Sequence, residues 1–240
     1  RLNANKNIAF QGSIVLGKGF VLEPDNAQRM LDDDPRNAEV LFPYLNGKDL
    51  NSDPEQQPSR WVINFWDWSE ERARDYKAPY EWIMARVYPE HMERSSTNSY
   101  QDIMNHWWQF WRPRAELYHA IGRGEHFENH PEGWDPEINP LDKVLVYATA
   151  ASKYSNFSFL GGAIIFSHAV GVIASNDFTD QIVLSTSIHN AWAFQYAGRM
   201  KQDLRYAPSN CLENFPFPET HKLDCDIEKL HTNRSSAMNA

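Results

Sequence analysis

The chain has 240 residues, 42% of them hydrophobic, which is enough for one large domain with its own core. Its formal net charge of -9 argues against a general nucleic-acid binder, because such proteins need clustered Lys and Arg to displace the counterions of a phosphate backbone. Two cysteines exclude a disulfide scaffold and a four-thiolate zinc site, and since no long apolar span or signal peptide is evident we expect a cytoplasmic setting without a membrane partner.

The first hundred residues are predicted to mix short strands with helices. Residues 1–7 are polar and are interpreted as a connector from a preceding domain. Residues 90–101 are polar again and are predicted to form a loop. Between them the pattern predicts a bent strand pair over 8–22, a helix over 24–31, a strand and turn over 40–50, a half-buried strand over 61–66, and a helix that Ser69 caps and Pro89 ends.

The rest of the chain continues this α+β pattern. A helix is predicted over 113–121, an exposed excursion rich in Gly, Pro, Glu and His over 122–142, strands over 143–149, 157–160 and 163–173, and a helix over 180–201. We therefore expect a mixed, twisted β-sheet with flanking helices over 8–218, followed by a C-terminal tail over 219–240 that lacks apolar periodicity.

Catalytic and metal-binding patterns are missing from the sequence. It has no Asn-Pro-Pro-aromatic motif for a flipped adenine, and no Gly-rich loop between a strand and a helix. His126 and His130 are four residues apart, but nearby Gly and Pro oppose the helix on which they could share a metal ion. His189 has no nucleophile in a recognisable setting and is interpreted as a packing residue. We expect no catalytic residue, no metal and no cofactor in this chain.

The aromatic run 107–111 is followed by two arginines. Its three tryptophans and one phenylalanine are interpreted as core residues, although such rings also stack on bases or sugars. Arg112 and Arg114 flank Pro113, so both guanidinium groups are expected on a rigid turn from which they can reach a phosphate or a guanine edge.

The most informative segment lies near the C-terminus. Five residues at helical spacing predict a mostly apolar stripe that faces the core: Ile188, Ala191, Trp192, Gln195 and Tyr196. Arg199, Lys201 and Arg205 gather beyond the expected helix end, where cations suit phosphate groups. The run Phe215-Pro-Phe-Pro218 is expected to be extended, with its rings packed down.

A series of short motifs occurs in a definite order along most of the chain. They are Phe10 to Ser13, Gly17 to Phe20, Pro43 to Asn51, Trp107-Trp108, Leu184 to Trp192, Gly198 to Lys201, Arg205-Tyr206 and Asn214 to Pro218. In this order they resemble the target-recognition domain of MmeI-like restriction-modification enzymes, which are single-chain type II enzymes that also methylate adenine.

The resemblance implies a non-catalytic module that recognises double-stranded DNA for a methyltransferase domain of the same chain. The parent enzyme would methylate adenine with S-adenosylmethionine, and could also cleave DNA or serve in phage defence. In the loop over 149–156 this sequence departs from the family, because small and polar residues replace its Pro, Glu and Arg. The residues expected to contact DNA are Arg94, Asn98, Arg112, Arg114, Thr149, Ser152, Lys153, Tyr154, Asn156, Arg199, Lys201 and Arg205.

Two other classes of function remain open at this stage. A carbohydrate-binding or glycoside-hydrolase-like domain is suggested by nine tryptophans and the acidic balance, but it needs carboxylates that face each other across a cleft, and the sequence pairs none. A protein-interaction domain could use its aromatic face to bind a neighbour. An Asn-Pro-Pro-Tyr-type motif upstream in the same chain would decide for DNA recognition.

Overall fold

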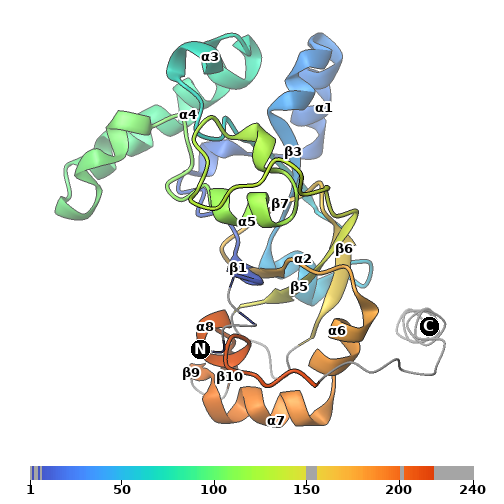
Figure 1. Ribbon diagram of the computed structural model, residues 1–240. Helices are drawn as coiled ribbons and strands as arrows, with labels where there is room; N and C mark the ends of the chain where they lie inside the picture. The colour runs from blue at the N-terminus through green and yellow to red at the C-terminus, as the bar shows by residue number, and fades with distance from the viewer. Residues whose placement is uncertain (1, 3–4, 6, 150–155, 201–202, 219–240) are drawn as a thin grey trace.

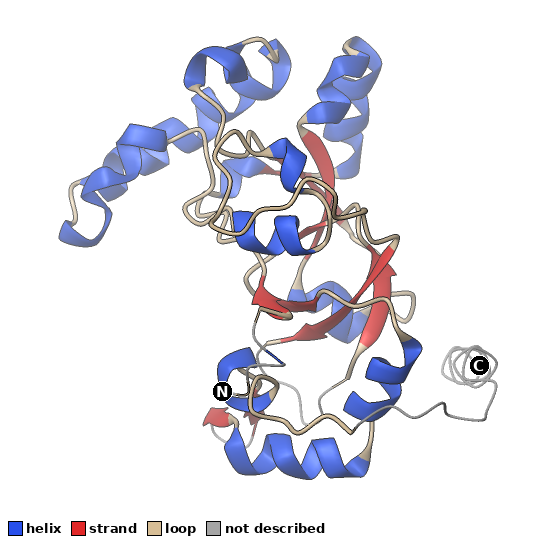
Figure 2. Ribbon diagram, viewed as in Figure 1, coloured by secondary structure: helices blue, strands red, loops and turns tan. Residues whose placement is uncertain are grey.

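The computed structural model describes residues 2, 5, 7–149, 156–200 and 203–218 (Figure 1). Strands run through the middle of the molecule, and helices lie at both of its ends (Figure 2). Within the described residues, the strands form two four-stranded sheets and one two-stranded hairpin. The predicted α+β class is confirmed, while the mixed sheet that the sequence predicts is divided into two sheets.

The first sheet, named here the central sheet, has the strand order β1-β8-β5-β6 with antiparallel neighbours. It consists of β1 (Ala9–Gln11), β5 (Lys143–Ala148), β6 (Ser158–Gly161) and β8 (Val170–Ile173). Successive side chains of a strand point to opposite faces. Val144 and Val146 therefore pack into a larger core, and Leu145 and Tyr147 pack into a smaller one. Burial on both faces explains why β5 is a continuous apolar run.

The second sheet has the order β2-β4-β3-β7 and lies beside the larger core. Its strands are β2 (Val21–Leu22), β3 (Leu41–Leu45), β4 (Arg60–Ile63) and β7 (Ile165–Phe166), and β3 pairs with β7 in parallel. Within the described residues, the chain from 18 to 126 also forms nine helical segments, of which α2 contacts β5 of the central sheet. They are η2 (Lys18–Phe20), α1 (Pro24–Asp33), η3 (Pro35–Glu39), α2 (Gly47–Ser52), α3 (Glu70–Arg74), α4 (Lys77–Ser95), η4 (Asn98–His106), α5 (Ala115–Ala120) and η5 (Gly124–His126).

The smaller core lies on the other face of the central sheet. There α6 (Phe178–Leu184), α7 (Ser187–Tyr196) and α8 (Pro208–Cys211) accompany the hairpin of β9 (Gly198–Met200) and β10 (Asp203–Arg205). The buried rings of Tyr147, Phe157 and Tyr206 meet edge to face or tilted, with centroids between 4.8 and 5.6 Å apart. The central sheet thus separates two apolar clusters, and it holds the molecule together between them.

Two predicted strand segments cross between the sheets. Residues 8–22 were expected to form a strand pair, yet β1 belongs to the central sheet and β2 to the second sheet. Residues 163–173 were expected to form one strand, but the segment is divided into β7 and β8, which also belong to different sheets. Both predictions are wrong for one reason. The apolar pattern indicates which residues are buried, but the strand with which a segment pairs depends on residues far away in the sequence.

The predicted helix boundaries also need correction. Ser69 accepts a hydrogen bond from the backbone N–H of Arg72 at 3.2 Å, so the predicted cap is confirmed, but the helix is divided into α3 and α4. Pro89 lies inside α4, which continues to Ser95. Since Ala85 and Pro89 are exposed, solvent can satisfy the carbonyl that loses its partner. The predicted loop over 90–101 is therefore mostly helical.

The predicted helix over 180–201 is also interrupted. The Thr186 hydroxyl accepts from the backbone N–H of His189 at 3.2 Å and begins α7, which ends at Tyr196. None of the helices that the structure describes combines the length and the apolar character that a membrane crossing needs.

Asn5 ties the N-terminal segment to the C-terminal one. Its buried side-chain amide donates to the carbonyl oxygens of Leu212 at 3.1 Å and Phe215 at 2.7 Å. Phe215 is itself buried, as expected for the Phe-Pro-Phe-Pro segment. Asn5, which lies in the segment interpreted as a connector over 1–7, is thus anchored to the C-terminal segment.

Candidate nucleic-acid interface

One end of the central sheet gathers loops from distant parts of the chain. Because neighbouring strands are antiparallel, the C-terminal ends of β1 and β5 meet the N-terminal ends of β8 and β6. Gln11, Thr149, Asn156 and the turn over 167–169 therefore lie at this end, which we name the loop end of the sheet. This is where the structure places part of the predicted readout loop.

Gln11 connects the loop end to Arg114. Its side-chain amide donates to the carbonyl oxygen of His168 at 2.8 Å, while its oxygen accepts from the Arg114 guanidinium at 3.2 Å. The hydroxyl of Thr149 makes a longer contact of 3.4 Å to the same His168 carbonyl. Arg114 and Thr149, which are far apart in the sequence, are thus held around one short polar network.

The two residues after Gln11 fix the arginine segment beside the sheet. A Cβ atom on Gly12 would lie 2.2 Å from the carbonyl oxygen of Ser167, so only glycine fits there. The buried Ser13 hydroxyl donates to the carbonyl oxygen of Pro113 at 2.9 Å. Ile14 and Arg112 continue this contact as an antiparallel bridge. The Phe-Gln-Gly-Ser motif therefore positions the Arg-Pro-Arg segment.

Arg114 has an unusual backbone conformation. Its φ of 65° and ψ of 53° are left-handed, a region that non-glycine residues enter mainly where the surrounding structure holds them. Its guanidinium approaches Glu116 at 3.7 Å, and its buried Nε has no hydrogen-bond partner among the described residues. Arg112 is exposed, with its guanidinium 5.7 Å from the ring centre of Trp111. The rigid turn predicted around Pro113 is thus present, with Arg114 tethered and Arg112 accessible.

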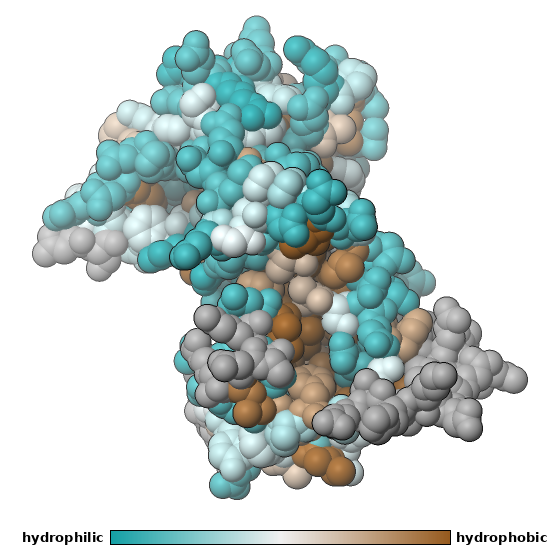
Figure 3. Space-filling model, viewed as in Figure 1, coloured by the Kyte–Doolittle hydropathy of each residue, from teal (hydrophilic) through white to brown (hydrophobic). Residues whose placement is uncertain are grey.

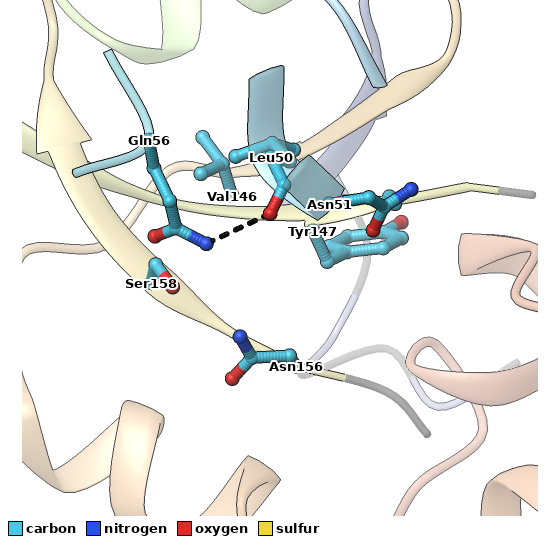
Figure 4. A pocket seen from close by; sticks show the side chains of 8 residues that line it. Leu50, Asn51, Gln56, Val146, Tyr147, Asn156 and Ser158 are labelled. Atoms are coloured by element: carbon cyan, nitrogen blue, oxygen red, sulfur yellow. Dashed lines mark hydrogen bonds between the residues drawn. The ribbon is translucent and has the colours of Figure 1, made fainter. Parts of the chain in front are cut away.

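On the opposite side of the loop end, Asn156 faces α2. Asn156 is exposed and lines a small cavity of about 30 Å³ together with Leu50, Asn51 and Gln56 (Figure 4). A volume of this size accommodates a water molecule and no larger ligand. The cavity therefore marks the place where α2 meets Asn156, the last residue of the predicted readout loop.

The structure does not bring all of the predicted residues to this place. Arg94 lies on α4, where it pairs with Glu90 at 2.9 Å, and not in a polar loop as predicted. Asn98 begins η4. Figure 1 shows the far end of α4, the central sheet and the β9–β10 hairpin at three separate places. Ser152, Lys153 and Tyr154 lie outside the described residues.

Two of the three predicted phosphate-binding cations lie on a hairpin that follows the end of α7. Arg199 and Arg205 belong to β9 and β10, in which Leu204 pairs with Arg199 and Arg205 pairs with Gly198. Arg205 is exposed between the buried residues Leu204 and Tyr206. Lys201 and the side chain of Arg199 lie outside what the structure describes.

Most of the apolar stripe predicted on α7 does not face the core, and only its half-buried member Trp192 packs against the buried Phe215. Ile188 is 73% exposed and Tyr196 51% exposed, and Figure 3 shows apolar surface over this helix. The buried residues of α7 are instead His189 and Ala193. The spacing of the stripe was right, but its direction was wrong, because the polar residue His189 occupies the core.

His189 is a structural residue, as the sequence suggests. Its Nδ1 lies 2.8 Å from the carbonyl oxygen of Leu184 and its Nε2 lies 3.0 Å from the Tyr206 hydroxyl. A carbonyl only accepts, so Nδ1 carries the proton and Nε2 accepts from Tyr206. Burial lowers the pKa of His189 to about 4. A neutral imidazole with both nitrogens engaged has no free position for a substrate.

The other aromatic and imidazole candidates also pack within the fold. Trp107 and Trp108 are buried, which confirms their interpretation as core residues. The ring of His126 stacks on Trp66 with centroids 4.5 Å apart, and that of His130 stacks on Trp134 at 3.7 Å. All nine tryptophans are buried or half-buried, so their number does not indicate an exposed platform for sugars.

Four residues of this site were not predicted from the sequence. Gln11 was noted only as part of a motif, and His168, Asn51 and Gln56 were not singled out. His168 is exposed in the turn between β7 and β8, directly between Gln11 and Thr149. Gln11 and Asn51 could have been found as polar residues within the short motifs on which the family resemblance rests. His168 and Gln56 gave none.

Comparisons with known proteins place these observations in a family context. Residues 141–219 match the family model described as the MmeI target recognition domain. A solved structure of the Type IIL restriction-modification enzyme MmeI in complex with DNA is similar to this chain, with a TM-score of 0.62 and 16% sequence identity. The likeness covers 97% of this chain and 27% of that one. A search of curated proteins finds no match.

The chain thus spans about a quarter of the length of the MmeI chain that it resembles. The family match covers β5 to the Phe-Pro-Phe-Pro segment, and the structural likeness extends to nearly the whole chain. The resemblance inferred from the sequence is confirmed: residues 141–219 match the MmeI target recognition domain, and the chain has the fold of the corresponding part of MmeI.

Proposed function

We propose that this chain is the sequence-specific duplex-DNA recognition module of a larger DNA adenine methyltransferase. The observation that carries the proposal is the loop end of the central sheet, where two arginines and several neutral polar side chains converge from separate segments. The family match and the likeness to MmeI, which was solved with DNA, support it.

The chemistry of the loop end suits base edges in the major groove. A guanidinium binds the two acceptors of guanine, and an asparagine amide binds the paired donor and acceptor of adenine. Arg112 and Arg114 would supply the first kind of contact, and Asn156 the second. Arg205 on the β9–β10 hairpin, together with Arg199 and Lys201, would bind phosphates and set the register of the duplex.

Two of the acids that contribute to the net charge of -9 have structural roles close to α2. Asp49 accepts from the backbone of Asn46 at 3.1 Å and from the Ser59 hydroxyl at 2.7 Å. Asp53 accepts from the backbone N–H groups of Glu55 and Gln57. These carboxylates hold the start of α2 and the turn after it.

Catalysis would lie outside this module. We propose that a methyltransferase domain of the same chain binds S-adenosylmethionine and receives the target adenine in a cytoplasmic restriction-modification or phage-defence enzyme. Base flipping and methyl transfer would occur there. Any DNA cleavage would be a separate activity of other domains of the parent enzyme.

Selection from a random duplex library tests the recognition proposal. Full-length protein is incubated with the library, and the bound duplexes are sequenced. We expect one motif to be enriched, and Asn156→Ala to lose the requirement for an adenine at one position of it. Enrichment of no motif by the wild-type protein would overturn the proposal.

The methylation proposal has its own test. Sequencing of DNA methylated by the full-length enzyme should show methyladenine in the same motif that the library selection finds. Titration of the 240-residue chain with S-adenosylmethionine should give no heat of specific binding, because the cofactor site is assigned elsewhere. A one-to-one isotherm would contradict this division of labour.

A further inference from the structure

The cavity between β5, β6 and α2 has a rim of amide side chains. Asn51, Gln56 and Asn156 line it, and Asn156 comes from a segment about a hundred residues away from the other two in the sequence (Figure 4). Ser158 adds a hydroxyl group. The floor is formed by parts of Leu50, Val146, Tyr147 and Ala148. The rim is therefore polar and uncharged.

The turn that carries Gln56 is held in a costly conformation. Gln56 has a φ of 54°, which is left-handed and unfavourable for a residue with a side chain. Asp53 fixes the turn by accepting from the backbone N–H of Glu55 at 3.1 Å and of Gln57 at 2.9 Å. A glycine would occupy this position without strain. Strain of this kind, held by surrounding hydrogen bonds, is concentrated at binding sites.

The amides retain hydrogen-bonding capacity. Gln56 uses its side-chain nitrogen to donate to the Leu50 carbonyl at 3.1 Å, which orients the amide toward the cavity (Figure 4). The exposed side chains of Asn51 and Asn156 make no hydrogen bond with the part of the chain that the structure describes. Among the described residues, the three amide oxygens of this rim and the side-chain nitrogens of Asn51 and Asn156 thus have no hydrogen-bond partner.

We propose that Asn51 and Gln56 form, with Asn156, a second base-reading element that recognises adenine edges of duplex DNA. An amide presents a donor and an acceptor side by side, and adenine offers the matching acceptor and donor in the major groove. The cavity is too small for a base, so the duplex is read at the rim and is not inserted. This proposal rests on the proposed function, and it assigns part of the specificity to the α2 side of the loop end.

The experiment is selection from a random duplex library with the full-length protein and three variants. Asn51→Ala removes one amide. Gln56→Gly removes another and also relieves the backbone strain. Gln57→Ala is the matched control, because Gln57 is an exposed amide beside Gln56 that does not line the cavity. The melting temperature of each variant is measured in parallel.

The expected result separates readout from structure. Asn51→Ala and Gln56→Gly should each relax an A·T position of the motif by about tenfold, while the melting temperature of Gln56→Gly stays equal or rises. Gln57→Ala should leave the motif unchanged. If the wild-type protein selects a motif and both test variants keep its stringency, the second reading element is refuted while DNA recognition stands. If the wild-type protein selects no motif, the proposed function itself fails.

Discussion

Gln11 is the residue on which the arrangement of the loop end depends most. It is a neutral bridge, with its nitrogen on the His168 carbonyl and its oxygen on the Arg114 guanidinium. A glutamate there would pair with Arg114 and cancel its charge. The neutral amide instead orients the guanidinium while leaving its positive charge available for a base or phosphate.

Replacement of Gln11 by alanine should reduce specificity more than stability. Loss of an oriented hydrogen bond to a charged group costs about 1.5–3 kcal/mol, and here the cost should fall on the complex with the selected duplex. The measurement is the ratio of affinities for selected and random duplexes. Gln28→Ala is the control, because Gln28 is an exposed amide that bonds to Asp32 on α1. An unchanged ratio in Gln11→Ala would show that Arg114 needs no such support.

His189 should make stability depend on pH. Its pKa is about 4 in the folded chain and near 6.5 when unfolded, so between these values the unfolded state binds more protons. The stabilising effect of the neutral imidazole is complete above pH 6.5 and is lost as pH falls toward 4, by at most roughly 3 kcal/mol. Urea unfolding of wild type and His189→Gln at several pH values measures the difference. Parallel curves for the two proteins across this window would contradict the assignment.

At the scale of elements, the close approach of the backbone after β1 to the end of β7 depends on Gly12. A Cβ atom there would meet the Ser167 carbonyl oxygen at 2.2 Å and the Phe166 carbonyl oxygen at 2.5 Å, and backbone atoms cannot move aside cheaply. Gly12→Ala should destabilise the fold by about 3 kcal/mol or more. Gly161→Ala is the control, since its nearest contact would be at 4.0 Å. Equal unfolding free energies for the two variants would refute this role of Gly12.

The β9–β10 hairpin should strengthen binding to DNA equally for every DNA sequence. If the exposed Arg205 binds a phosphate, Arg205→Ala will weaken binding to all duplexes alike and reduce the slope of log affinity against log salt by about one unit. Arg36→Ala supplies the comparison, because Arg36 is an exposed arginine paired with Asp34 at 2.7 Å, away from the loop end. A salt slope that Arg205→Ala leaves unchanged would favour a purely structural hairpin.

Elements with strong local signals could be predicted from the sequence. The strand β5, the cap at Ser69 and the burial of Trp107, Trp108 and Phe215 follow from apolar pattern and residue type. The prediction of which face of α7 is buried was wrong, because buried hydrogen bonds let a histidine replace an apolar residue in the core. The loop end could not be predicted, because its main contact joins Gln11 and His168 across 157 positions.

At the scale of the whole molecule, the two-sided central sheet explains how one chain can present several loops together. Its faces carry the larger and the smaller core, so the strands are fixed from both sides, and their ends project loops from a rigid base. The resemblance motifs indicated DNA recognition, but only the strand order shows that 11–13, 112–114, 149 and 156 share one end of the sheet.

Photo-crosslinking tests most directly whether this loop end reads DNA. The full-length protein is bound to its selected duplex carrying 5-iodouracil in place of single thymines, irradiated, and digested, and the crosslinked peptides are identified by mass spectrometry. We expect crosslinks to peptides that contain Gln11, Arg112 to Arg114, 149–156, His168, or residues 46–57, which include α2. Crosslinks confined to α4 and η4, with none at the loop end, would contradict the account.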